Sequence, residues 1–267
     1  MDKRGANGMN VGIIGLSRDG KAVAEHLLGK TACNLFAYDP DGRALPDGLR
    51  MLPTAAELID RCGRVILALE SPRELTLLLN SVAEYIREGK IFIDLTDTSP
   101  ALAHMIANEM RRRGALYLDC GVFGRDGLAD DFLCFAGGSS RAFAEAQPLI
   151  RCFAPGCRYM GPSGRGRAMR LLCRSLAAQL RRSVGETGEL AASFGIGEEY
   201  LLECLSGFER IADPLAVLRG EQPPMPDALL AKDVRLVAEM ARRAGLELGG
   251  LRSAEEAYKS MDPMEYR

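Results

Sequence analysis

Apolar positions along roughly the first 160 residues follow two alternating patterns. Short continuous apolar runs, typical of buried strands, are separated by segments in which apolar residues recur every three or four positions, as on one face of a helix. The runs predict strands at Val11–Leu16, Leu35–Tyr38, Val65–Leu69, Ile91–Leu95, Leu116–Leu118 and Phe132–Ala136. The segments between them predict helices at Ala22–Leu28, Ala55–Asp60, Pro72–Arg87, Ala101–Arg113 and Arg141–Ile150. This alternation indicates βαβ units, so we expect an α/β domain with a mainly parallel, Rossmann-type sheet.

The strand pattern stops near Gly166, and only helical patterns follow. They predict helices at Arg167–Phe194, Glu198–Ser206 and Pro226–Ala244. The change predicts a second, smaller, all-α domain. The Gly- and Pro-rich segment at residues 161–167 is the natural boundary. We therefore expect a dinucleotide-binding domain over residues 9–163 and a helical domain over residues 164–267.

The first predicted strand runs into a glycine-punctuated turn, VGIIGLSRDG, at residues 11–20. A Rossmann domain holds the pyrophosphate of a dinucleotide at such a strand–turn–helix junction. The usual G-x-G-x-x-G pattern reads here as Gly15, Ser17 and Gly20. Ser17 adds a side chain where the second glycine lets phosphate approach the backbone, and Asp19 adds a carboxylate that repels phosphate. An ordinary strand–turn–helix without a ligand is the alternative interpretation.

Asp39 comes directly after the second predicted strand and lies 19 residues after Gly20. An acidic residue near this place binds the adenosine ribose hydroxyls of NAD and repels the 2′-phosphate of NADP. The alternative is that Asp39 only starts a turn before Pro40. We expect NAD as the cofactor, while Arg18 and Arg43 leave NADP possible because a guanidinium pairs with phosphate.

Composition limits the partners. The chain has 267 residues, of which 47% are hydrophobic and 26% charged, and a net charge of −2. No basic surplus favours nucleic acid, and no apolar run reaches the about 18 residues of a membrane span. The first ten residues lack the apolar core of a signal peptide, so we expect a cytoplasmic protein. The eight cysteines include no C-x-x-C pair, which favours reduced thiols over disulfides or a metal site.

Six segments carry a series of motifs in order. They are GIIGLSRDG at 12–20, VILALESP at 65–72, IDLTDTSP at 93–100, LDCGVFGRDGLADDFLCFAGG at 118–138, GPSGRGRAMRLLCR at 161–174 and LLAKDVRLVAEMARRAG at 229–245. With these motifs, residues 9–258 resemble the β-hydroxyacid dehydrogenase family, which includes 3-hydroxyisobutyrate and 6-phosphogluconate dehydrogenases. The resemblance implies a dinucleotide domain joined by a long helix to a helical domain, an active cleft between them, and a homodimer formed through the helical domain.

The resemblance also implies the residues of the site. Those that bind the cofactor would be Gly15, Leu16, Ser17, Arg18, Asp19, Gly20, Asp39, Leu69, Glu70, Thr96 and Lys232. Those that contact substrate would be Gly121, Phe123, Gly124, Arg125 and Cys173. The family lysine that relays the proton of the substrate hydroxyl matches Arg170, which cannot readily act as an acid or base because a guanidinium stays protonated. We expect Lys232, buried beside guanidinium groups, to take over the proton transfer.

Two interpretations of these replacements remain open. In the first, Arg170, Arg125 and Arg167 line a cationic cleft, and the protein is an NAD(P)-dependent oxidoreductase for a small anionic hydroxyacid, ketoacid or related substrate. In the second, the protein is a catalytically inactive paralogue that binds nucleotide or a protein partner. Arg167, Arg170 and Arg174 would then form an ordinary exposed stripe on a helix.

Overall fold

The computed structural model describes residues 9–30, 33–43, 47–123, 133–206 and 227–259. The chain divides into two compact units, Met1–Cys173 and Arg174–Arg267. Helix α6 (Arg165–Ser193) supplies its first residues to the first unit and the others to the second. The domain boundary expected between residues 163 and 164 lies just before this helix and stays a prediction.

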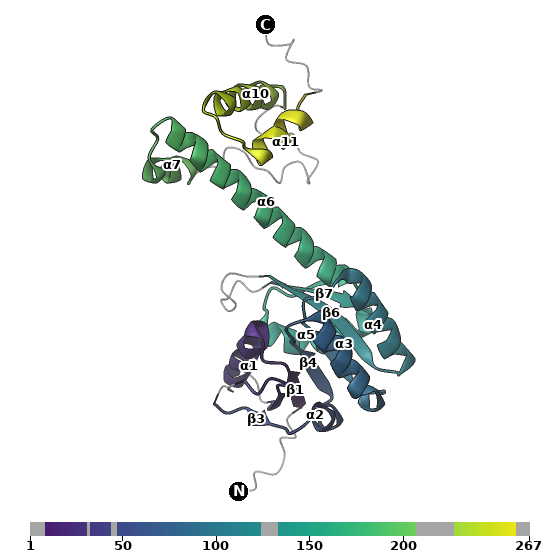
Figure 1. The fold of residues 1–267 in the computed structure, drawn as a ribbon. Coiled ribbons are helices and arrows are strands. Elements are labelled where there is room, and N and C mark those ends of the chain that lie inside the picture. Colours follow the sequence, from purple (N-terminus) through teal and green to yellow (C-terminus); the bar gives the residue numbers. More distant parts are fainter. Residues whose placement is uncertain (1–8, 31–32, 44–46, 124–132, 207–226, 260–267) are drawn as a thin grey trace. The chain divides into compact units, whose positions relative to one another are not determined.

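Among the described residues, the first unit contains an eight-stranded sheet in the order β3-β2-β1-β4-β5-β6-β7-β8 (Figure 1). Its strands are β1 (Asn10–Ile14), β2 (Asn34–Tyr38), β3 (Arg50–Met51), β4 (Arg64–Leu67), β5 (Ile91–Asp94), β6 (Leu116–Phe123), β7 (Leu133–Gly138) and β8 (Arg158–Gly161). Only the β6–β7 pair is antiparallel within this sheet. The chain moves outward from β1 to β3 and returns to β4, so the strand order switches between β1 and β4. Such a switch point is where open α/β sheets bind ligands, and the Rossmann-type prediction is confirmed.

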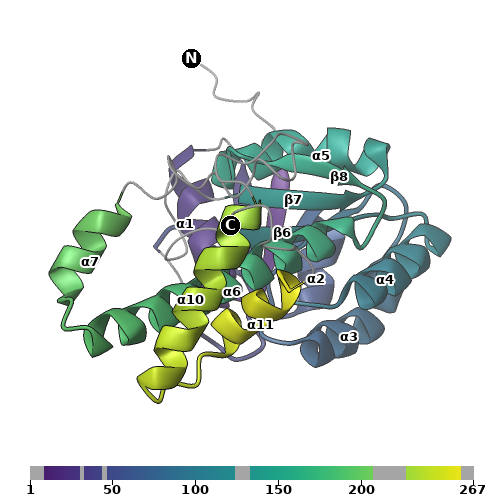
Figure 2. The same cartoon turned by 90° about the horizontal axis from the view of Figure 1, so that it is seen from above.

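Helices cover both faces of the sheet, as Figures 1 and 2 show. The apolar faces of α1 (Arg18–Lys30) and α5 (Ser140–Phe153) share one core cluster with the strands. The apolar faces of α2 (Ala55–Arg61), α3 (Pro72–Ser81) and α4 (Pro100–Arg112) share the other. Burial on both faces explains why the strands read as continuous apolar runs.

The structure differs from the predicted elements mainly where no apolar run marks a strand. Both residues of β3 are exposed, and β8 is exposed or half-buried, so neither was predicted. Strand β6 continues past Leu118 because β7 pairs with it as far as Phe123. Helix α3 stops at Ser81, and a 3-10 turn at Ala83–Tyr85 carries the rest of the pattern.

The second unit is helical in its described residues. It contains most of α6, together with α7 (Glu198–Leu205), α10 (Asp227–Arg243) and α11 (Gly249–Ala257), of which α11 was not predicted. Its small core consists of Leu190, Ala241 and Leu248, with partly buried Val237, Leu246 and Leu251 packed against them. Among the described residues, no helix is long and apolar enough to cross a membrane.

Candidate functional site

The turn after β1 has the geometry of a dinucleotide-binding turn. Gly15 has φ +89°, and a Cβ there would lie 2.8 Å from the carbonyl carbon of Ala68, so only glycine fits. A Cβ on Gly20 would lie 2.9 Å from the Cβ of Ala68, so this residue lets α1 pack closely on the loop after β4. Two of the three expected glycine functions are therefore present.

Ser17, at the place of the missing glycine, caps helix α1. Its hydroxyl accepts a hydrogen bond from the amide of Gly20 at 3.4 Å, as an N-cap serine does. The amides of Arg18 and Asp19, in the first turn, have no acceptor within the helix by its geometry. Such amides and the helix dipole attract phosphate, and the 72% exposed Arg18 side chain adds a positive charge. The turn fits a diphosphate, although the carboxylate of Asp19 within the turn repels phosphate.

Asp39 lies beside this turn, as predicted, but its carboxylate is fully occupied. One oxygen accepts the amide of Leu16 at 2.6 Å and the Arg43 guanidinium at 3.2 Å. The other accepts the amides of Asp41 and Arg43 at 3.0 and 3.1 Å. Burial alone raises the pKa of Asp39, but these hydrogen bonds and the charge of Arg43 together hold it below its usual value. The carboxylate thus ties the β2 loop to the glycine turn, and nothing in the structure tests the ribose contact predicted for it.

The predicted residues after β4 and β5 lie next to each other. The hydroxyl of Thr96 accepts the amide of Leu69 at 3.2 Å, and both side chains are buried. Glu70 is half-exposed, and its carboxylate pairs with Arg43 at 3.1 Å. The carboxyl ends of β1, β2, β4 and β5 thus bring together all the predicted cofactor residues except Lys232.

Arg170 lies in the first unit, where its side chain is only 5% exposed. Its Nε donates to the carbonyl of Val122 at 2.9 Å, and its two terminal nitrogens bind the carboxylate of Asp97, one of them at 2.6 Å. Asp97 follows β5, and its side chain is 49% exposed. A guanidinium held in this way presents a carboxylate, rather than a bare cation, to the surroundings.

Gly121 is needed for α6 to approach the sheet. A Cβ there would lie 2.6 Å from the Cβ of Arg170 and closer still to the carbonyl oxygen of Gly166. This contact explains the small residue at the position. Its predicted contact with substrate stays a prediction.

Arg167 belongs neither to an exposed stripe nor to a cationic cleft, so both expectations for it were wrong. It is 1% exposed, pairs with Asp94 at 3.1 Å, and donates to the carbonyls of Cys120 and Asp94, each at 2.7 Å. The hydroxyl of Tyr117 donates to the same Asp94 at 2.6 Å. Burial, together with the charge of Asp94, raises the pKa of Tyr117 well above its ordinary value. Arg167 is a structural cation that fixes α6 to β5 and β6.

Asp119 anchors the start of α6. Its carboxylate accepts the amides of Gly164 and Arg167 at 2.7 and 3.0 Å. Burial raises the pKa of Asp119, and these hydrogen bonds and Arg167 oppose the shift only in part. The beginning of α6, with Arg170 one turn further along, is therefore rigidly placed on the sheet.

The other predicted site residues lie on separate elements or outside the described residues. Phe123 ends β6 opposite Leu133, while Gly124 and Arg125 lie outside the described residues. Cys173 is half-buried on α6. Lys232 is an exposed residue of α10 in the second unit, and its role in the site stays a prediction. In the described part of the chain, no group of three or more His, Cys, Asp or Glu residues could hold a metal ion.

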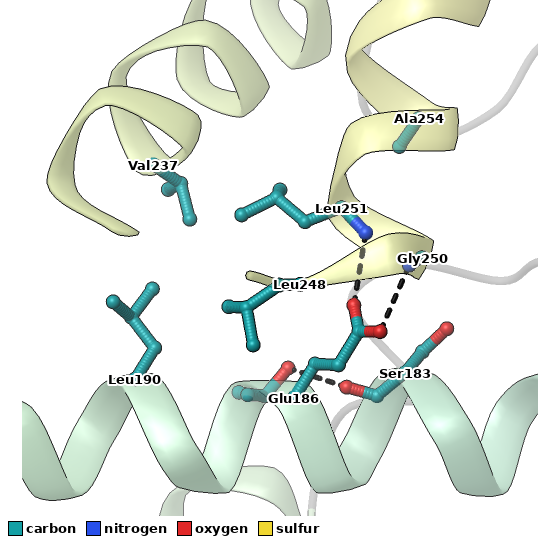
Figure 3. Close-up of a pocket in the computed structure, with 9 residues that line it drawn as sticks. Ser183, Glu186, Leu190, Val237, Leu248, Gly250, Leu251 and Ala254 are labelled. Atoms are coloured by element: carbon teal, nitrogen blue, oxygen red, sulfur yellow. Dashed lines mark hydrogen bonds between the residues drawn. The ribbon is translucent and has the colours of Figure 1, made fainter. Parts of the chain in front are cut away.

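The second unit contains a pocket of about 220 Å³ between α6, α10 and α11, shown in Figure 3. Apolar side chains, Leu190, Val237 and Leu248 among them, line one side. On the other side the carboxylate of Glu186 accepts the amides of Gly250 and Leu251 at 2.8 and 2.9 Å (Figure 3). Glu186, a residue of α6, thereby caps the start of α11. The polar side of the pocket is thus explained by a contact that holds the two helices together, and it needs no ligand.

Residues 10–161, more than half of the chain, match the family model for the NAD binding domain of 6-phosphogluconate dehydrogenase. The chain belongs to the β-hydroxyacid dehydrogenase family. The resemblance drawn from the motifs and the expectation of an NAD-type cofactor are thus confirmed.

Individual members and neighbours agree with this. Human mitochondrial 3-hydroxyisobutyrate dehydrogenase is 27% identical over 277 residues, which cover 94% of this chain and 81% of the relative. An imine reductase from Bacillus cereus has the same fold, with a TM-score of 0.78, 19% identity, and 94% and 92% of the two chains covered. An imine reductase variant from Myxococcus stipitatus, solved in complex with NAD+, matches with a TM-score of 0.80, 16% identity, and 95% and 93% covered.

Three residues of this chain that hold the first unit together around Arg167 and Arg170 were not predicted as site residues. They are Asp97, which binds Arg170, Asp119, which anchors α6, and Asp94, which pairs with Arg167. All three lie in the motifs IDLTDTSP and LDCG, at the ends of predicted strands. A carboxylate at the end of a buried strand was the available signal, but the arginine partners are too distant in sequence to be matched with it.

Proposed function

We propose that the protein is an NAD(P)-dependent oxidoreductase that acts on a small hydroxyacid, ketoacid or related substrate. The observation that carries the proposal is the dinucleotide geometry at the carboxyl ends of β1, β2 and β4, in a chain that belongs to this family. When bound, the cofactor supplies the hydride chemistry, and the protein supplies orientation and charge.

The residues of the first unit would share the work as follows. The amides at the start of α1 would hold the diphosphate. Leu69 and Thr96, which are buried and hydrogen-bonded to each other, would support the cofactor site from within the fold. Arg170 is a positioning residue because its guanidinium is engaged by Val122 and Asp97. The side chain of Asp97 is 49% exposed, and we propose its carboxylate as the group that accepts the proton of a substrate hydroxyl.

The charge of an anionic substrate then needs other cations. Arg125, named from the family motifs, stays our prediction for that role, and Lys232 stays a predicted residue for proton transfer and cofactor binding. Such a substrate would compete with Asp97 for Arg170, and the small exposure of the Arg170 side chain favours Asp97.

A second candidate function is that of a nucleotide-binding protein without turnover, in a regulatory or structural role. The observation that favours it is the same ion pair: where the family has a lysine that relays a proton, this chain has an arginine neutralised by a carboxylate. The two functions share the cofactor site and differ only in the chemical step.

Hydride transfer separates the two. We would bind NAD+ to the purified protein and follow absorbance at the nicotinamide band with a panel of small hydroxyacids, then with NADH and the matching ketoacids. An oxidoreductase oxidises or reduces the cofactor with at least one member, and Asp97→Asn lowers kcat more than it changes KM. If wild-type protein binds the cofactor yet no substrate turns over, the second function holds, and Arg170→Lys with Cys173→Asn and Phe123→Ser is the variant to test for recovered traces of activity.

We also propose that the protein works as a homodimer in the cytoplasm. Exposed apolar side chains repeat at every fourth position along α6, at Leu172, Leu176, Leu180 and Val184. Such a stripe favours burial against another chain. All eight cysteines are free thiols, which suits a reducing compartment.

A further inference from the structure

Arg43 joins three carboxylates at the edge of the predicted cofactor site. Its terminal nitrogens lie 3.2 Å from Asp39, 2.7 Å from Asp41 and 3.1 Å from Glu70. Asp39 and Asp41 follow β2, whereas Glu70 follows β4. Since β1 lies between β2 and β4 in the sheet, the Arg43–Glu70 ion pair crosses the carboxyl end of β1, beside the glycine turn.

The three carboxylates differ in what they can still bind. The side chain of Asp39 is 0% exposed and already accepts four hydrogen bonds, so its position is structural. The side chains of Asp41 and Glu70 are 54% and 51% exposed. These two, and not Asp39, face whatever approaches the end of β1.

We propose that Glu70 and Asp41, held in place by Arg43, form the charge filter that selects NAD(H) over NADP(H) in this protein. The inference rests on the proposed binding of a dinucleotide at the β1 turn. In a Rossmann domain the adenosine ribose lies beside the end of β2, where its 2′-hydroxyl meets an acidic group. Here that group belongs to Glu70 or Asp41, while Asp39 holds the loop on which the filter is built.

The charge balance explains the selection. Three carboxylates surround one guanidinium, which leaves the cluster with two negative charges in excess. A ribose hydroxyl donates to a carboxylate and leaves this balance intact. A 2′-phosphate carries about −1.5 to −2 charges, so it would have to take Arg43 away from its partners and then remain beside them.

The test measures affinities for NADH and NADPH by fluorescence titration, with 5′-ADP and 2′,5′-ADP as probes of the adenosine end in thermal-shift assays. Glu70→Gln and Asp41→Ser remove one charge each, and both side chains are exposed enough for the variants to fold. Glu25→Gln is the control, because it removes one charge from an exposed position of α1. Asp39→Asn tests the structural role assigned to Asp39.

Wild-type protein is expected to bind NADH at least about tenfold more tightly than NADPH. The double variant Glu70→Gln/Asp41→Ser should shift the ratio of the two affinities toward NADPH by about tenfold or more, and 2′,5′-ADP should gain in the same sense. Asp39→Asn should weaken both nucleotides together, since it loosens the turn that both use.

Three results would overturn the filter: a wild-type preference for NADPH, a double variant whose ratio matches that of Glu25→Gln, or an Asp39→Asn variant that alone reverses the preference. Failure of the proposed function gives a different result. In that case neither NADH nor 5′-ADP binds the wild-type protein, and no ratio can be measured.

Discussion

The guanidinium of Arg170 is bound at two nitrogens by the carboxylate of Asp97, a residue 73 positions earlier in the chain. The pair joins the start of α6 to the loop after β5. In the proposed function, this ion pair stands where the family resemblance implies a proton-relaying lysine. We therefore propose that the stability of α6 on the sheet and the chemistry of the site depend on the same two side chains.

Asp97→Asn should destabilise the first unit. The mostly buried guanidinium of Arg170 would keep its charge and lose its counter-ion, which costs about 1.5–3 kcal/mol for hydrogen bonds to a charged group. Urea denaturation measures the change. Asp60→Asn, which breaks the exposed pair with Arg87, is the matched control, with an expected loss below about 1 kcal/mol. Equal losses in the two variants would show that the Arg170–Asp97 pair is an ordinary surface contact.

Gly121→Ala should separate α6 from β6. The added methyl group would collide with the Cβ of Arg170 and the backbone of Gly166, so we expect a loss of about 1–3 kcal/mol in denaturant unfolding. Gly185→Ala on the same helix meets no atom within 4 Å and should be neutral or stabilise by up to about 1 kcal/mol. An unchanged midpoint for Gly121→Ala would mean that the close approach of α6 is absent in solution.

Glu186 should make the stability of the second unit depend on pH. Burial raises the pKa of Glu186, but the amides of Gly250 and Leu251 and the guanidinium of Arg182 lower it below its ordinary value of 4.5 overall. A lowered folded-state pKa stabilises the fold above the unfolded-state pKa, and the stabilisation is lost as the pH falls through the folded-state value.

Thermal unfolding between pH 7 and pH 3 tests this, with Glu186→Ala as the variant. The variant should lose about 1–3 kcal/mol at pH 7, because two amides of α11 lose their acceptor, and its deficit should shrink at acid pH. Glu189→Ala, an exposed neighbour on α6, should change stability by less than about 0.5 kcal/mol. A deficit independent of pH would assign Glu186 a packing role only.

The apolar stripe on α6 should hold a dimer together. Leu176→Glu introduces a charge in the middle of the stripe, and light scattering at micromolar protein should then report a monomer where the wild type is a dimer. Gln179→Glu adds the same charge to a polar position of the helix and should leave the dimer intact. Wild-type protein that scatters as a monomer would refute the dimer.

Local patterns in the sequence were sufficient to predict most of the first unit. Val11–Leu16 and the helix after it are visible as an apolar run followed by a helical period, and Gly15 marks the turn because only glycine fits there. Strand β3 could not be predicted in this way, since its two exposed residues show no pattern of apolar positions. Helix α11 could not be predicted either, because its cap is Glu186, a residue of another helix.

The site was harder to predict than the fold. The motifs located Arg170 correctly at the start of α6, but its partner Asp97 is set by how α6 packs across β5 and β6. The contact between Arg43 and Glu70 likewise depends on the strand order β2-β1-β4, which no local spacing reveals. Ion pairs between residues that follow different strands cannot be predicted until the order of the strands in the sheet is known.

The measurement that tests the account most directly is a fluorescence titration of the purified protein with NADH and NADPH. The dinucleotide geometry at the β1 turn predicts saturable binding of NADH, and the charge filter predicts at least about tenfold weaker binding of NADPH. Binding should weaken on replacement of Gly15 by alanine, since the added Cβ would collide with Ala68. If neither nucleotide binds at millimolar concentration, the proposal of a dinucleotide-dependent oxidoreductase is wrong.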